Sequence, residues 1–448
     1  MNNLFSNIDA KAAIKQLSDV NSKLMKGAEL LTDVEDIDVG TAPKQLIYEE
    51  DKLKLYHYKP SADKACGVPI LVVYALVNRP YMLDIQPDRS FIRNMLSLGL
   101  DVYLVDWGYP TQSDRYLSMD DYINGYINNC VDAVRKDAKV EKVTLMGVCQ
   151  GGTFSSIYAS LHPEKVHNLI TLVAPFDFST DDALLFKWSK NMDIDALVDA
   201  YGVVPGSMLN DGFTMLMPFN LNIKKYVDML HVMENKDTLL NFLRMEKWIF
   251  DSPGQAGECL RQFVKDLYQG NKLVKGTLKI GDKTVDLGNI TMPILTIFGS
   301  ADHLVPPAAT KPINDLVGTK DKTLYEFKGG HIGVFVGARS QKELAPAIAK
   351  WLVTRDVAAP LKAKEAPKKS PAPAIVEPVI EKPVVAVAKV AKPVAAKPVA
   401  KKAPVAKATT AKATPAKATK AKVAAKPKPV APNAVPEVFK ATFKKPAK

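Results

Sequence analysis

The segment KVTLMGVCQGG (142–152) decides the fold. Its residues through Val148 form an apolar run that predicts a buried strand, and a helix is expected to start near Gly151. Cys149 stands between them in the pattern G-x-C-x-G. Glycines are needed around a residue on such a sharp turn, because a Cβ at the neighbouring positions would clash with the strained backbone. The segment therefore predicts a strand-turn-helix that presents Cys149 as a nucleophile.

Short apolar runs alternate with helical stretches on both sides of this segment. Strands are expected at 68–76, 101–108, 142–148, 168–175, 292–302 and 322–331, helices at 91–100, 119–139 and 341–355, and a hairpin at 45–58. Continuous Val/Ile/Leu strands between helices indicate a mostly parallel sheet that is covered on both faces. With the nucleophile turn after a strand, the pattern predicts an α/β-hydrolase fold.

Three parts of the chain are expected to be distinct. Residues 1–45 form an N-terminal helical segment, residues 46–358 form the catalytic domain, and residues 359–448 form a tail. The interval of about 177–285 breaks the strand–helix alternation, has a mostly helical pattern and holds seven of the chain's 14 Met, so it is interpreted as a cap inserted between two strands. Its methionines either fill a small irregular core or form a flexible apolar wall around a channel.

The charge of the chain is concentrated in the tail. Residues 361–448 contain 21 Lys, 4 Glu and no Arg or Asp, a net charge of +17, whereas the whole chain carries +12 and residues 1–360 therefore carry −5. The tail also has 24 Ala and 14 Pro but two aromatic residues, so it cannot bury enough apolar surface to offset its ordering entropy and is expected to be disordered.

The bulk features favour a cytoplasmic protein without a membrane span. The four cysteines, which are Cys66, Cys130, Cys149 and Cys259, form no CxxC pair, so neither a disulfide framework nor a zinc site is expected. The N-terminus lacks the basic and apolar regions of a signal peptide, and the longest apolar run, 68–77, is too short to cross a bilayer. We expect Cys66, Cys130 and Cys259 to be structural.

A cysteine nucleophile needs a base, and the base needs an acid that orients it. In this fold the acid and the histidine follow the nucleophile in that order, in loops at the carboxyl ends of strands. His331, within GGHIG, and Asp302, within GSAD, fit these positions better than the other histidines do, which are His57, His162, His167 and His231. His303 is expected to support the pair from its side or to form a salt bridge.

The oxyanion hole is expected to use two backbone N–H groups. One belongs to Gln150, directly after the nucleophile. The other belongs to Val77 or Asn78, in the loop that follows an early strand; an ordinary strand-to-loop turn is the alternative interpretation of that loop.

The choice of cysteine over serine favours a thioester substrate. Exchange between an acyl-CoA and a cysteine thiol is nearly thermoneutral, and the helix N-terminus and His331 both favour the thiolate. Acyl transfer from CoA to an alcohol then requires a dry site, which an apolar cap would supply. Residue types do not fix the acceptor, so a cysteine hydrolase of the dienelactone-hydrolase kind stays open. No metal or cofactor is expected.

Five segments together resemble the polyhydroxyalkanoate synthases, most closely the class III, two-component type. They are YALVNRPYMLD (74–84), DVYLVDWGYP (101–110), GVCQGG (147–152), GSADHLVPP (299–307) and GGHIGVFVG (329–337). The resemblance implies polymerisation of (R)-3-hydroxyacyl-CoA, chiefly 3-hydroxybutyryl-CoA, with release of CoA.

In this resemblance Cys149 is acylated, His331 is its base, and Asp302 orients His331 or helps to activate the substrate hydroxyl. The resemblance also implies a homodimer, location at polymer granules and a second, non-catalytic synthase subunit, with a class IV enzyme and its different partner as an alternative.

The tail departs from this resemblance. Its repeats, within 391–429, resemble the Lys-Ala-Pro tails of linker histones and of some granule-associated nucleoid-binding proteins. Three interpretations are open: a solvated spacer, non-specific DNA binding through phosphate contacts, or binding to an acidic partner or the granule surface. A non-enzymatic granule–nucleoid tether is the third hypothesis for the whole chain, although the intact Cys149, Asp302 and His331 set argues against it.

Overall fold

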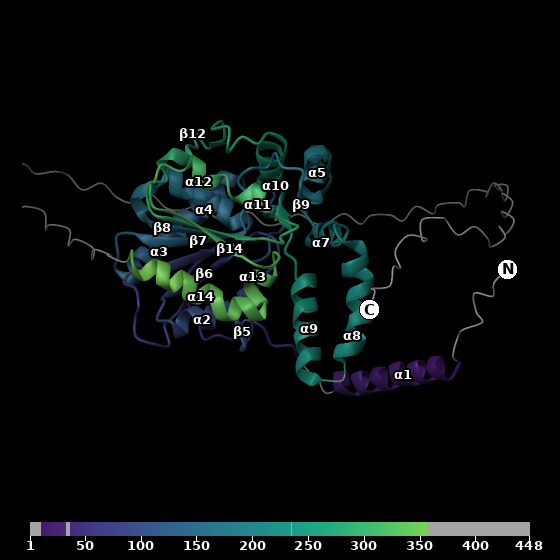
Figure 1. Cartoon of the computed structure of the whole chain (residues 1–448). Coiled ribbons are helices and arrows are strands. Elements are labelled where there is room, and N and C mark those ends of the chain that lie inside the picture. Colours follow the sequence, from purple (N-terminus) through teal and green to yellow (C-terminus); the bar gives the residue numbers. More distant parts are fainter. Residues whose placement is uncertain (1–9, 33–35, 234, 356–448) are drawn as a thin grey trace, which may run out of the picture. The chain divides into compact units, whose positions relative to one another are not determined.

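The computed structural model describes residues 10–32, 36–233 and 235–355 (Figure 1). The chain divides into two compact units, Met1–Lys368 and Lys369–Lys448. The second unit lies entirely outside the described residues. The predicted boundary between residues 358 and 359 and the tail that is predicted to be disordered also lie outside them. The description below concerns the first unit.

An eight-stranded sheet forms the centre of this unit, in the order β1-β2-β6-β3-β7-β8-β13-β14. Its strands are β1 (Gln45–Glu50), β2 (Leu53–Tyr58), β3 (Ile70–Val73), β6 (Val102–Asp106), β7 (Val143–Val148), β8 (Val166–Leu172), β13 (Ile294–Gly299) and β14 (Lys322–Phe327). The hairpin β1–β2 is antiparallel and joins β6 antiparallel, whereas all pairs from β6 to β14 are parallel. The predicted α/β-hydrolase fold with its mostly parallel sheet is confirmed.

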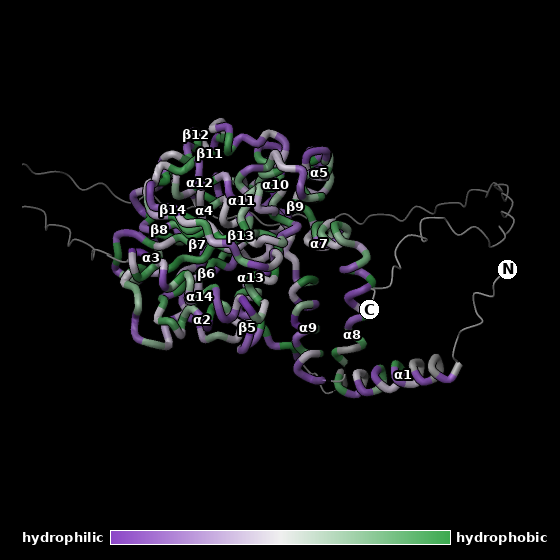
Figure 2. The backbone as a smooth tube through the Cα atoms, viewed as in Figure 1, coloured by the Kyte–Doolittle hydropathy of each residue, from purple (hydrophilic) through white to green (hydrophobic). Residues whose placement is uncertain are grey.

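Helices cover both faces of the sheet because its inner strands point apolar side chains both ways. In β3, Leu71 and Val73 belong to one buried cluster, and Ile70 and Val72 belong to another on the opposite face. The first face carries α3 (Asn128–Ala138), α4 (Gln150–Leu161) and α12 (Ile313–Leu316), and the second carries α2 (Phe91–Ser97) and α14 (Ala338–Val353). Figure 2 shows the matching hydrophobic colour along the central strands.

The interval between β8 and β13 is mostly helical. Its elements are α5 (Leu184–Asn191), α6 (Ile194–Tyr201), β9 (Val203–Val204), α7 (Gly206–Thr214), the π-helix η5 (Asn220–Lys224), α8 (Lys225–Val232), α9 (Lys236–Phe250), β10 (Gln255–Ala256), α10 (Gly257–Gln262), the π-helix η6 (Phe263–Gln269), β11 (Lys279–Ile280) and β12 (Lys283–Thr284). The antiparallel pairs β9–β10 and β11–β12 are two residues long in each strand.

The methionines of this interval do not all fill a core. Met233 is buried, but Met192, Met208 and Met215 have exposed fractions of 39%, 41% and 54%. The core-filling interpretation is therefore wrong for these three side chains, and whether any of the seven lines a channel stays a prediction.

Two further segments differ in detail from the sequence expectation. The N-terminal helix is α1 (Ala10–Thr32), with residues 1–9 and 33–35 outside the described part. The helix expected over 119–139 is a π-helix, η3 (Asp121–Ile127), that continues as α3. Within the described residues, none of the helices combines the length and hydropathy needed to span a membrane. The boundaries of the three predicted parts stay predictions.

Candidate active site

Cys149 lies on a sharp strand-to-helix turn with a positive φ, and the segments around this turn pack very closely. β7 ends at Val148, α4 begins at Gln150, and Cys149 between them has φ 52° and ψ −124°. A Cβ on Gly151 would lie 2.3 Å from the carbonyl oxygen of Val73, and one on Gly147 would lie 2.3 Å from the Cα of Gly152. The backbone of β3 and the start of α4 therefore approach so closely that only glycine fits, as the sequence predicts.

His331 and Asp302 come from the loops after β14 and β13, the two strands at one edge of the sheet. The Nδ1 atom of His331 lies 2.7 Å from Oδ2 of Asp302, and both side chains are buried. The other carboxylate oxygen, Oδ1, accepts hydrogen bonds of 2.9 Å from the backbone N–H groups of Leu304 and Val305. Asp302 is thus fixed by its own loop while it fixes one nitrogen of His331.

The remaining side of His331 faces Cys149. Burial lowers the pKa of His331, but the negative charges of Cys149 and Asp302 and the hydrogen bonds to both raise it to about 10. A histidine with such a pKa holds its proton at neutral pH, between an aspartate and a cysteine sulfur. The structure therefore brings together the three side chains that the sequence selects, in the order cysteine, histidine, aspartate.

Backbone N–H groups suited to an oxyanion lie beside the cysteine. The N–H of Gln150 is the first of α4 and has no acceptor within the helix. In the loop after β3, the N–H groups of Val77 and Asn78 donate to no atom among the described residues. Asn78 has φ 59° and its Nδ2 donates to Oγ of Ser252 at 2.6 Å. The N–H groups of Gln150, Val77 and Asn78 thus have no acceptor among the described residues, and the choice between Val77 and Asn78 as the second donor stays open.

The side chain of Gln150 has a role that the sequence did not indicate. It is buried, and its Oε1 accepts a hydrogen bond from the N–H of Leu76 at 3.2 Å. This bond ties the first residue of α4 to the loop that carries Val77 and Asn78. The sequence motif indicates a role for the backbone N–H of Gln150 only. The hydrogen bond of its side chain to Leu76 could be found only once β3 and β7 were known to be neighbours.

The other histidines and cysteines lie elsewhere. His57 pairs with Asp101, His162 with Asn124, and His167 with the carbonyl oxygen of Arg355. His303 forms no ion pair among the described residues, and burial and the nearby His331 lower its pKa against the opposing effect of Asp302; its expected supporting role stays a prediction. Cys66, Cys130 and Cys259 are free thiols and buried. No group of three or more potential metal ligands occurs in the part of the chain that the structure describes.

Comparison with known proteins identifies the family of the chain. A sequence profile described as "alpha/beta hydrolase fold" matches residues 68–338, and one described as "Poly-beta-hydroxybutyrate polymerase (PhaC) N-terminus" matches residues 11–95. The "Poly(3-hydroxyalkanoate) polymerase subunit PhaC" of Allochromatium vinosum is 54% identical over 343 residues, which are 76% of this chain and 97% of the relative. The chain belongs to the poly(3-hydroxyalkanoate) polymerase family.

Other relatives extend this polymerase family assignment. The subunit of the same description from Synechocystis is 49% identical over 360 residues, 78% of this chain and 95% of the relative. A solved monoacylglycerol lipase of Paleococcus ferrophilus is similar at a TM-score of 0.42 and 19% identity, covering 67% of this chain and 99% of the lipase; at that score it adds nothing to the assignment. The polymerase relatives leave about a quarter of this chain unmatched although nearly all of their own length is used.

Proposed function

We propose that this chain polymerises (R)-3-hydroxyacyl-CoA, chiefly 3-hydroxybutyryl-CoA, into polyhydroxyalkanoate through a thioester on Cys149. The observation that carries the proposal is the sequence of contacts from Cys149 through His331 to Asp302 at the strand-to-helix turn of a chain in the polymerase family. Acylation of Cys149, and each residue's role in it, are the parts that go beyond family membership.

In the first half of the reaction, the thiolate of Cys149 attacks the thioester carbonyl carbon of the acyl-CoA. The carbonyl oxygen becomes an oxyanion that the N–H of Gln150, with that of Val77 or Asn78, would stabilise. The bond from the carbonyl carbon to the CoA sulfur then breaks. His331 gives its proton to the departing CoA thiolate, which leaves neutral histidine and an acyl thioester on Cys149.

In the second half, neutral His331 removes the proton from the 3-hydroxyl group of an incoming substrate. The hydroxyl oxygen attacks the thioester carbon, an ester bond forms, and the Cys149 thiolate leaves beside the newly protonated His331. The product is a 3-acyloxyacyl-CoA, one unit longer, whose own thioester can acylate Cys149 again.

The environment of Asp302 supports orientation of His331 rather than activation of the substrate hydroxyl. One carboxylate oxygen accepts two backbone N–H groups and the other faces His331. These bonds engage three of the roughly four lone-pair sites of the carboxylate, and the side chain is 0% exposed, so Asp302 is poorly placed to accept a proton from a substrate hydroxyl.

The assay that tests the function separates polymerase from hydrolase. Purified protein is incubated with (R)-3-hydroxybutyryl-CoA, and free CoA, free 3-hydroxybutyrate and insoluble polyester are measured together. We expect CoA and polyester in matching amounts of acyl units. CoA with free hydroxy acid and no polyester would favour a cysteine hydrolase of the dienelactone-hydrolase kind, and no CoA release would favour a non-enzymatic granule–nucleoid tether.

The basic tail supports a second, independent proposal. Residues 361–448 carry a net charge of +17 from 21 Lys and 4 Glu, and lysines spread along a chain contact phosphates without reading bases. We expect full-length protein to bind unrelated DNA sequences equally and to release them as salt rises from about 50 to 200 mM. A variant ending at residue 360 that bound DNA as the full chain does would contradict this and leave the spacer or acidic-partner interpretation.

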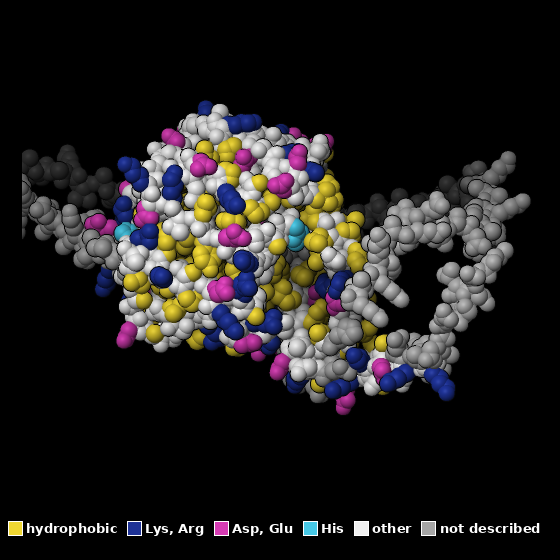
Figure 3. All heavy atoms as spheres, in the orientation of Figure 1, with side chains coloured by type: hydrophobic (Ala, Val, Ile, Leu, Met, Phe, Trp, Pro, Cys, Tyr) yellow, Lys and Arg dark blue, Asp and Glu magenta, His cyan; other side chains and the backbone are white. Residues whose placement is uncertain are grey.

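Homodimer formation, a second non-catalytic subunit and location at cytoplasmic granules are proposals of the same family origin. A strip of apolar side chains on η5 and α8 supports an apolar contact, because Phe219, Ile223 and Val227 recur every four residues with exposed fractions of 63%, 54% and 53%. Exposed apolar side chains in the adjoining α7 region are visible in Figure 3. We assign the strip to a second copy of the chain and expect Phe219→Asp to shift sedimentation toward the monomer; unchanged sedimentation would contradict the assignment.

A further inference from the structure

Cys149 lies where the two buried clusters of the catalytic unit meet. Its side chain packs against the cluster on the α3 and α4 face of the sheet and also against the cluster on the α2 and α14 face. Each cluster contributes one tyrosine whose phenol interacts electrostatically with Cys149: Tyr268 from the first cluster and Tyr74 from the second. Both phenols therefore lie close enough to Cys149 to interact with its charge.

The two tyrosines stand on different parts of the chain. Tyr74 directly follows β3 on the loop that carries Val77 and Asn78, which the proposed function assigns to the carbonyl oxygen. Tyr268 lies in the π-helix η6, within the insertion between β8 and β13. Because the proposed function assigns the loop after β3 to the carbonyl oxygen, Tyr268 is the phenol left for another oxygen of the acyl group.

The hydroxyl of Tyr268 is a polar atom without a partner in an apolar wall. The residue is 9% exposed, and its hydroxyl has no hydrogen bond to any described residue. Its ring packs against those of Phe178, Phe186 and Phe263, with centroids 4.8, 5.1 and 5.9 Å away. Burial, and then the negative charge of Cys149, raise the pKa of this phenol, so the hydroxyl keeps its proton and can donate it to an oxygen.

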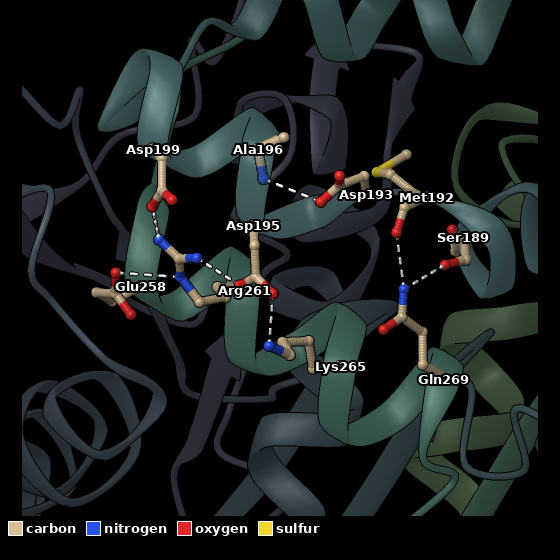
Figure 4. A network of polar contacts seen from close by, with 10 residues as sticks. All are labelled: Ser189, Met192, Asp193, Asp195, Ala196, Asp199, Glu258, Arg261, Lys265 and Gln269. Atoms are coloured by element: carbon tan, nitrogen blue, oxygen red, sulfur yellow. Dashed lines mark hydrogen bonds and ion pairs between the residues drawn. The ribbon is translucent and has the colours of Figure 1, made fainter.

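The position of Tyr268 is fixed by the polar network in Figure 4. Next to it, Nε2 of Gln269 donates to the carbonyl oxygen of Met192 at 2.9 Å, at the end of α5. One turn earlier, Nζ of Lys265 lies 2.7 Å from a carboxylate oxygen of Asp195 in α6. Arg261 binds Asp195, Asp199 and Glu258 as well. These bonds hold η6 against α5 and α6, and π-helical turns of this kind often mark functional positions.

We propose that the hydroxyl of Tyr268 donates a hydrogen bond to the oxygen on carbon 3 of the acyl group, as a residue that positions the substrate and selects 3-oxygenated acyl groups. The inference rests on the proposed function and deepens it. A 3-hydroxyacyl group has two oxygens close to the thioester, of which the carbonyl oxygen has its donors in the backbone of Gln150 and of the loop after β3. The oxygen on carbon 3 is a free hydroxyl in the first unit and an ester oxygen in the growing chain. It is the oxygen to which no hydrogen-bond donor has yet been assigned.

The test compares two substrates that differ in this oxygen alone. Single-turnover release of CoA is measured with 3-hydroxybutyryl-CoA and with butyryl-CoA, for the wild type and for Tyr268→Phe, which keeps the ring. Loss of one hydrogen bond is expected to slow acylation by 3-hydroxybutyryl-CoA about tenfold and to leave the rate with butyryl-CoA unchanged. The matched control is Tyr122→Phe, because Tyr122 is also buried, lies in the same cluster and has no hydrogen bond from its phenol to a described residue.

The outcomes separate the two levels of the proposal. Equal losses on both substrates, no loss on either, or the same selective loss in Tyr122→Phe would overturn the role of Tyr268 and leave the polymerase function standing. Failure of the wild type to release CoA from 3-hydroxybutyryl-CoA would instead contradict the proposed function itself.

Discussion

Two histidine–aspartate pairs among the described residues have similar distances and little exposure to solvent. His57 Nε2 lies 2.6 Å from Oδ1 of Asp101, and His331 Nδ1 lies 2.7 Å from Oδ2 of Asp302. The exposed fractions are also similar, at 11% and 5% for the side chains of the first pair and 8% and 0% for those of the second. Distance and burial alone therefore do not distinguish a reactive pair from a structural one.

The difference lies in what surrounds each histidine. The ring of His57 stacks on Tyr103 at 4.1 Å, its second nitrogen faces Asp137 at 3.5 Å, and Lys64 lies 2.6 Å from the other oxygen of Asp101. Each of these contacts fixes the position of His57 or of Asp101. His331 instead faces Cys149, which follows the carboxyl end of the parallel strand β7, and open α/β sheets bind ligands at this edge. A histidine–aspartate pair indicates catalysis only when a nucleophile completes it.

The largest effect is expected from removal of the nucleophile. Cys149→Ala should lower polymer formation on the order of 10⁵-fold, because no other group can carry the acyl chain. Cys130→Ala is the control, since Cys130 is a buried free thiol in α3, outside the strand-to-helix turn. Polymer and CoA release are measured together, and substantial polymer from Cys149→Ala would remove the thioester from the mechanism.

Next in size is the exchange of the two histidines for glutamine. His331→Gln should lower kcat about 10³- to 10⁴-fold, because proton transfer to CoA and from the hydroxyl is lost. His57→Gln should leave kcat within about twofold and lower the free energy of unfolding by about 1–3 kcal/mol, because Oδ1 of Asp101 loses the partner that His57 provides. Urea denaturation with steady-state assays checks both, and comparable losses of kcat in the two variants would contradict the contrast between the pairs.

Substitution of the two aspartates should show the same difference as substitution of the histidines, with a smaller loss of kcat. Asp302→Asn is expected to reduce kcat about 10³-fold, since an amide lets His331 turn or adopt the wrong tautomer. Asp101→Asn should reduce stability and spare kcat. If Asp302→Asn kept full activity, His331 would not need its orienting partner.

The sequence was sufficient for Cys149, Asp302 and His331 because each follows a strand whose apolar run is readable and whose carboxyl end lies at one edge of a parallel sheet. It was insufficient for the side chain of Gln150 and for Tyr268. Leu76 lies 74 residues from Gln150 and Cys149 lies 119 residues from Tyr268, and the packing of such distant segments has no local period. The π-helical turns η3 and η6 were missed for a related reason, since a π-turn leaves the helical pattern intact.

The smallest effect is a difference in pH dependence between the pairs. The raised pKa of His331 means that its proton stabilises the fold; this contribution is complete below the ordinary value of 6.5 and is lost as pH rises toward about 10. Burial raises the pKa of Asp101, but hydrogen bonds from His57 and Lys64 outweigh it and lower the pKa, so this contribution is present above 3.8 and is lost as pH falls below that value.

Thermal unfolding of matched variants measures this difference. The gap in Tm between the wild type and His331→Gln should narrow from pH 6.5 to pH 10, whereas the gap between the wild type and Asp101→Asn should narrow from pH 5 to pH 3. Gaps that narrow at the same end of the pH scale would show that the two pairs are held by the same forces.

The most direct measurement is the mass of the protein after brief mixing with (R)-3-hydroxybutyryl-CoA, followed by mapping of the modified peptide. We predict one or more added 3-hydroxybutyryl units on the peptide that contains Cys149, removable by hydroxylamine and absent from Cys149→Ala. Polymer formation with an unmodified Cys149 at every time point, or the same adduct on Cys149→Ala, would contradict a thioester at this residue.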